Sequence, residues 1–85
     1  MLSPASTLSH LARHQHARIA TVDWEALQPG EARRLREFGV DEGVEIELLH
    51  RAWLGGGPVA CRIGRMTVAL RPHVAAAIRV AASAD

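Results

Sequence analysis

The chain has 85 residues, a formal charge of +1 from ten basic and nine acidic residues, and a hydrophobic fraction of 48%. This length allows one small domain, and the balanced charge provides no field that would steer it onto nucleic acid or an anionic membrane. The single cysteine, Cys61, excludes an internal disulfide framework. With no signal segment and no apolar run near the roughly 20 residues that span a bilayer, the sequence predicts a cytoplasmic protein without membrane insertion.

The first quarter of the chain predicts two short turns and one strand. Residues 1–6 are mostly small and predict a flexible start, after which Thr7 can cap a single helical turn. The segment 17–22 is rich in β-branched residues and predicts the first strand. Asp23 can then cap a turn that places Trp24 as a lid on the core.

The strongest helical signal lies at 31–38, where apolar residues recur every three positions and form a narrow stripe. Gly39 can take the left-handed conformation that ends a helix, and Val40 is placed to pack back on Leu35. We therefore expect the helix to end at this glycine, followed by a tight turn at 41–43.

An alternating strand is expected after this turn, at 44–51. Its alternation directs Glu45 and Glu47 toward water and the apolar residues inward. Two consecutive leucines interrupt the pattern, so a bulge is expected at 48–49. A Gly-rich hairpin tip follows at 55–58.

The last third of the chain alternates again and is expected to close the sheet. The expected elements are strands at 59–63 and 66–70 around a two-residue turn, a helix from Pro72 through Ala77, a strand at 78–80 and a flexible tail at 81–85. Five short strands cannot bury both faces of an open sheet, so closure is favoured. The predicted fold is mainly β: a small five-stranded barrel at 7–80 with one or two short inserted helices.

Several motifs, taken together, resemble the FeoA family. They are Leu-Ser-His-Leu at 8–11, an Arg-rich helix, a Gly-punctuated turn and a Val/Glu strand at 30–49, Ala-Trp-Leu-Gly at 52–55 with Pro58, and the segments 69–71 and 75–80. The resemblance implies an SH3-like barrel of the bacterial ferrous-iron uptake system. It further implies an accessory protein to FeoB, a membrane permease with a cytoplasmic GTP-binding domain, and no required cofactor.

Two segments are candidate partner-binding surfaces. Arg33, Arg34 and Arg36 project away from the apolar stripe of the helix, either as a solvated face or as a docking surface for an acidic patch on the permease. In the loop expected after the strand at 44–51, Trp53 precedes Leu54 and Gly55. This tryptophan is either an interface anchor or a side chain folded over the open end of the barrel.

Histidines near the N-terminus are the candidate metal ligands. The family usually has Lys-Pro-Gly-Glu where this chain has Arg-His-Gln-His, at 13–16. His10 and His14 are four residues apart, a spacing that would put two imidazoles on one helix face. With His16 and Asp23 they form a candidate Zn²⁺ site, within one chain or between two copies, against the alternative of solvated surface histidines. Bridging metal or the open sheet edges could also support a homodimer.

No catalytic constellation is present, so we expect no enzymatic activity. Cys61 falls on the inward register of its strand, which predicts a buried residue and not a nucleophile. Weak net charge and few aromatic residues argue against nucleic-acid binding. Two functions therefore remain: an accessory protein docking on the permease, and a metal-responsive regulatory module with the N-terminal histidines as sensor.

Overall fold

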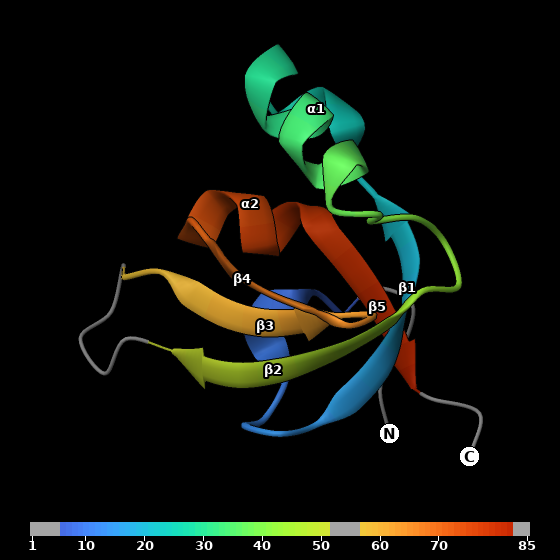
Figure 1. Cartoon of the computed structure of the whole chain (residues 1–85), viewed down its shortest axis with the longest axis vertical. Coiled ribbons are helices and arrows are strands. Elements are labelled where there is room, and N and C mark those ends of the chain that lie inside the picture. The colour runs from blue at the N-terminus through green and yellow to red at the C-terminus, as the bar shows by residue number, and fades with distance from the viewer. Residues whose placement is uncertain (1–5, 52–56, 83–85) are drawn as a thin grey trace.

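The computed structural model describes residues 6–51 and 57–82, and Figure 1 gives the arrangement of their elements. Two single-turn 3₁₀ helices, η1 and η2, and two α-helices are interspersed with five strands. In chain order these are η1 (Leu8–His10), β1 (His16–Val22), η2 (Trp24–Ala26), α1 (Pro29–Glu37), β2 (Glu45–Arg51), β3 (Val59–Ile63), β4 (Met66–Leu70), α2 (Pro72–Ala77) and β5 (Ile78–Ala82).

The five strands form one antiparallel sheet in the order β4-β3-β2-β1-β5. The sheet coils strongly, so that α2 and η1 lie against its interior side (Figure 1). Alternate side chains of every strand fill that interior, and Ile19, Ile46, Leu48 and Val80 are each at most 1% exposed. The predicted fold class, mainly β with five strands and short inserted helices, is confirmed.

Local irregularities fall where the sequence predicts them. The β2–β3 register shifts between Leu48 and His50, which confirms the bulge expected at the paired leucines. Gly64 has φ of +59° in the two-residue turn between β3 and β4, a conformation that glycine adopts without strain. A second register shift, between Ile19 and Thr21 in the β1–β5 ladder, has no signal in the sequence.

Helix α1 begins at Pro29, two residues before the predicted start, and ends as predicted. At its C-terminus Gly39 has φ of +84°, and the Val40 N–H donates to the Leu35 carbonyl at 3.0 Å. This pattern is a Schellman ending, which satisfies carbonyls that a helix end leaves without partners. The helix stands away from the barrel in Figure 1, and only Ala32 and Leu35 on it are buried.

Helix α2 is part of the barrel wall. It spans the predicted Pro72–Ala77, buries Val74, Ala75 and Ala77, and leads directly into β5. Strand β5 continues to Ala82, two residues past its expected end, because Ala81 and Ala82 pair with β1. The remainder of the predicted flexible ends, 1–5 and 83–85, lies outside the described residues.

One side chain differs from its predicted orientation. Glu47 was expected to point to water, yet it is only 9% exposed because charged neighbours cover it on the outer face of the sheet. Met66 begins β4 beside the turn and is 43% exposed, so it does not join the core as Val68 and Leu70 do. No helix among the described residues is long and apolar enough to cross a membrane.

Candidate functional site

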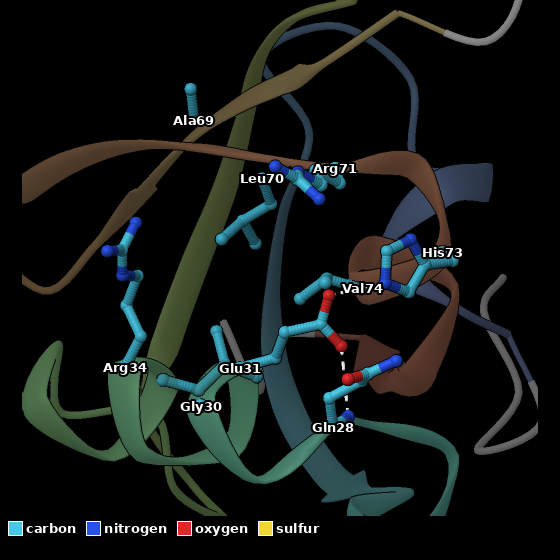
Figure 2. Close-up of a pocket in the computed structure, with 10 residues that line it drawn as sticks. Gln28, Gly30, Glu31, Arg34, Ala69, Leu70, Arg71, His73 and Val74 are labelled. Atoms are coloured by element: carbon cyan, nitrogen blue, oxygen red, sulfur yellow. Dashed lines mark hydrogen bonds and ion pairs between the residues drawn. The ribbon is translucent and has the colours of Figure 1, made fainter.

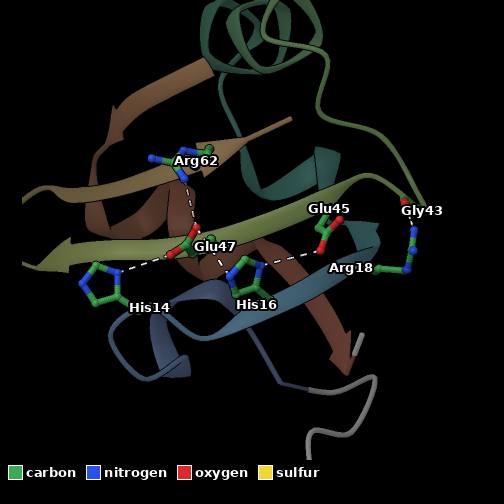
Figure 3. Close-up of polar contacts among 7 residues, drawn as sticks. All are labelled: His14, His16, Arg18, Gly43, Glu45, Glu47 and Arg62. Atoms are coloured by element: carbon green, nitrogen blue, oxygen red, sulfur yellow. Dashed lines mark hydrogen bonds and ion pairs between the residues drawn. The ribbon is translucent and has the colours of Figure 1, made fainter. Parts of the chain in front are cut away.

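Figure 3 shows the first candidate site, where Glu47 lies among three other side chains. Its Oε2 lies 3.3 Å from His14 Nδ1, and its Oε1 lies 3.7 Å from His16 Nε2 and 3.4 Å from Arg62 Nη1. Strand register explains two of these contacts, since Glu47 is directly opposite His16 on β1 and Arg62 on β3. His14 reaches the carboxylate from the loop before β1, where its own φ is +64°. The cluster compensates the burial of the Glu47 charge.

The structure brings together only part of the predicted metal-ligand set. Helix η1 ends at His10, which contacts Thr7, so the prediction that His10 and His14 share a helix face is wrong. Asp23 follows the opposite end of β1 from His16. Across 6–51 and 57–82, no three His, Cys, Asp or Glu side chains are placed to hold one metal ion. A site shared between two copies stays a prediction.

The three arginines of α1 have different surroundings, although all three are exposed as expected. The Arg36 guanidinium lies 4.3 Å from the centre of the Trp24 ring, a cation–π contact that fixes this side chain over the edge of the core. Arg34 lines a groove, and Arg33 does not line it. Trp24 itself is half-buried against the core, in agreement with its predicted place as a lid.

The groove lies between α1 and the junction of β4 with α2, and we call it the α1–α2 groove (Figure 2). It has a volume of about 610 Å³, within the range of roughly 300–1,000 Å³ typical of ligand sites. Three basic side chains line it: Arg34, Arg71 and His73. Its apolar lining includes Leu35, Leu70 and Val74.

One ion pair joins the two helices across this groove. Glu31 Oε2 of α1 lies 2.6 Å from His73 Nε2 of α2, and Glu31 Oε1 accepts the Gln28 N–H at 3.0 Å. The backbone hydrogen bond, and after it the bond with His73, lowers the pKa of the Glu31 carboxyl. Sequence reasoning missed Arg71 and His73, because they lie about 40 residues from α1 and no motif links them to it.

Cys61 is fully buried, as its strand register predicts. Burial raises the pKa of its thiol to about 11, so the thiol is protonated at neutral pH and is a poor nucleophile. The loop residues Trp53, Leu54 and Gly55, predicted to bind a partner, lie outside the described residues.

A family model described as the FeoA domain matches residues 6–82, nearly the whole chain. A search of curated proteins found no match to the chain. Among solved structures, FeoA of Stenotrophomonas maltophilia in complex with zinc is 33% identical, with 88% of each chain covered and a TM-score of 0.75. That protein is described as a prokaryotic SH3-domain protein and a candidate activating factor of ferrous iron transport. The SH3-like character expected for this barrel is therefore confirmed.

Two other solved structures are similar. Iron(II) transport protein A of Clostridium thermocellum is 32% identical over 87% of this chain, with a TM-score of 0.75, and this chain spans only 43% of that one. FeoA of Chlorobium tepidum is 29% identical over 92% of this chain and 70% of its own, with a TM-score of 0.79. A manganese-dependent transcriptional repressor, 22% identical, shares the fold, with a TM-score of 0.79.

Proposed function

Because the chain belongs to the FeoA family, we propose that it is a cytoplasmic accessory factor of ferrous iron uptake that docks on the GTP-binding part of a FeoB-type permease. It acts through protein–protein contact and needs no cofactor for this role. By binding one conformational or nucleotide state of the permease more tightly than the others, it shifts the permease toward that state.

The observation that supports docking best is the position of α1. The helix stands away from the barrel and carries three exposed arginines, while its two buried residues only anchor it (Figure 1). A basic helix presented in this way offers charge complementarity to an acidic patch, and charge complementarity raises association rates and selectivity. The predicted loop contacts of Trp53, Leu54 and Gly55 would extend the same docking interaction.

The test is a binding assay with the purified cytoplasmic domain of the permease, in its GTP-bound, GDP-bound and nucleotide-free states. We expect the double variant Arg33→Glu/Arg34→Glu to lose binding, because it reverses two charges on the docking helix and so changes its net charge by four units. Trp53→Ala should weaken binding if this side chain is an interface anchor.

The matched control is Arg13→Glu/Arg79→Glu, which makes the same change in net charge at two exposed positions that lie outside α1 and do not line the grooves beside it. Loss of binding in both double variants would indicate a general charge effect and count against docking through α1. Failure of the wild-type protein to bind in every nucleotide state would contradict docking on this domain.

A second candidate function is a metal-responsive module, supported by the contacts of His14 and His16 with one buried carboxylate. The two imidazoles contact different oxygens of Glu47, and Arg62 shares one of them, so this arrangement does not form a closed site within one chain. A metal bound between copies would show as Zn²⁺-dependent dimerisation in sedimentation, abolished in His14→Gln/His16→Gln. No binding of Zn²⁺ or Fe²⁺ at micromolar concentration in isothermal titration would remove this candidate.

A further inference from the structure

We propose that the α1–α2 groove binds an acidic segment of the partner protein, with a carboxylate held between Arg34 and Arg71. The inference rests on the proposed function, because it names the chemistry by which this protein would hold its partner. It also shifts the docking site from the outer face of α1 to the side of the helix that faces α2.

The two guanidinium groups approach the groove from different elements. Figure 2 shows Arg34 extending from α1 toward β4, and Arg71 at the junction of β4 and α2. Neither arginine takes part in an ion pair with the residues that the structure describes. Planar guanidinium groups bind carboxylates through paired, charge-assisted hydrogen bonds, and two of them flanking one groove would favour an anionic occupant.

The carboxylate already in the groove leaves both arginines without an ion pair. Glu31 is hydrogen-bonded to the Gln28 N–H and contacts His73 Nε2 at 2.6 Å, so both of its oxygens have partners, and the charge of Arg71 also acts on this carboxylate. The contact with His73 links α1 to α2 across the groove. An incoming carboxylate would meet Arg34 and Arg71 without displacing Glu31.

The floor of the groove adds little apolar area. Leu35, Leu70 and Val74 line it, but they are already covered, with exposures of 1%, 5% and 5%. Burying them further would gain little free energy, because that gain scales with the apolar area removed from water. Charge is therefore the feature of the groove that selects its occupant.

Other occupants match the groove less well. No Trp, Tyr or Phe lines it, so it lacks the stacking surfaces by which proteins hold single-stranded nucleic acid. The net charge of +1 for the whole chain likewise gives little general attraction for polyanions. Local charge therefore favours a peptide carboxylate held by two arginines.

The experiment compares single variants that differ only in their relation to the groove. The dissociation constant for the cytoplasmic domain of the permease is measured for the wild type, Arg34→Gln, Arg71→Gln and the control Arg33→Gln. The control lies on the same helix, is equally exposed and does not line the groove. We expect each groove variant to weaken binding about tenfold, or about 1.4 kcal/mol, because it removes a charge-assisted hydrogen bond, and the control to weaken it less than about twofold.

A peptide arm separates failure of this inference from failure of the proposed function. A twelve-residue peptide of alternating Glu and Leu is titrated into the ¹⁵N-labelled protein, beside the same peptide with Gln for Glu. Selective shifts of the amide signals of residues 34, 35, 70, 71, 73 and 74 with the Glu peptide support the groove, even where the permease domain does not bind. No shift at these positions overturns the inference.

Two further outcomes would also overturn it. If the permease domain binds the wild type and both groove variants within threefold, docking stands but the groove is not its site. If the protein alone forms a dimer that Arg34→Gln and Arg71→Gln dissociate, the occupant is a second copy of this chain and not an acidic partner.

Discussion

The two α-helices of this small domain differ in how much of each is buried and in the charge that each exposes. Helix α2 has six residues, three of them buried, and none of its residues carries a permanent charge. Helix α1 has nine residues, of which two are buried, and it exposes three arginines. The first completes the barrel wall and leads into β5, whereas the second stands outside the barrel (Figure 1). The contrast separates a helix retained for stability from one available for recognition.

This division also explains why the groove lies between them. The proposed binding groove has one wall that belongs to the core and one wall that presents polar groups. Here α2 and the end of β4 supply the fixed wall, and α1 supplies Glu31 and Arg34. Substitutions on the two helices are therefore expected to have different effects on stability.

The largest expected effect is on α2. Ala75 is fully buried, and Ala75→Asp places an unpaired charge in the core, which we expect to lower the free energy of unfolding by about 4 kcal/mol. Ala76→Asp is the matched control, because this neighbour on the same helix is exposed, and its effect should stay within about 0.5 kcal/mol. Urea denaturation followed by circular dichroism measures both. Equal effects would show that α2 is not a fixed part of the wall.

An intermediate effect is expected at the ends of α1. Gly39 has φ of +84° and open space around its Cα, so Gly39→Ala should destabilise by about 1 kcal/mol through backbone strain alone. Gly30, inside the helix, has equally open space and no positive φ, and Gly30→Ala should stabilise by up to about 1 kcal/mol. In thermal melting, Gly39→Ala and Gly30→Ala should shift the melting temperature in opposite directions. Shifts of the same sign would contradict the Schellman ending.

The smallest effect concerns the ion pair that joins the two helices. Because the folded protein lowers the pKa of Glu31, this carboxylate stabilises the fold above the ordinary glutamate pKa, and the contribution is lost as the pH falls through the lowered value. Glu31→Gln should therefore have a lower urea midpoint than the wild type at pH 6, and the difference between the two midpoints should shrink as the pH falls below the ordinary glutamate pKa. A difference in urea midpoint that does not change with pH would mean that the ionised Glu31 carboxylate contributes nothing to stability.

Local signals in the sequence were sufficient to predict the barrel fold. The end of α1 at Gly39, the bulge after Leu48 and the start of α2 at Pro72 each depend on one or two residues whose backbone preference is strong. Alternation then assigned the inward residues of β3, including Cys61. Because a small barrel has few alternative ways to bury such strands, these local decisions determine the topology.

The candidate sites could be predicted only in part, because they depend on residues distant in sequence. Arg34 was identified on α1, but nothing local indicates that Arg71 lies across a groove from it. Glu47 was expected in water, since alternation assigns it to the outer face and cannot reveal that a loop brings His14 over it. The prediction for His10 was wrong for a different reason. Its four-residue spacing from His14 suits a longer helix than the single turn that forms.

The described chain enters and leaves the barrel at one place. The Val80 N–H donates to the Ser6 carbonyl at 2.8 Å, and Thr7 bridges Arg79. A domain with this closure can be inserted into a longer polypeptide as a unit, since the segments that enter and leave it are hydrogen-bonded to each other. The same fold occurs within a manganese-dependent transcriptional repressor, where the matched region makes up 38% of the longer chain. For engineering, a reporter domain joined at either end would share this one corner, leaving the groove between the helices open to a partner.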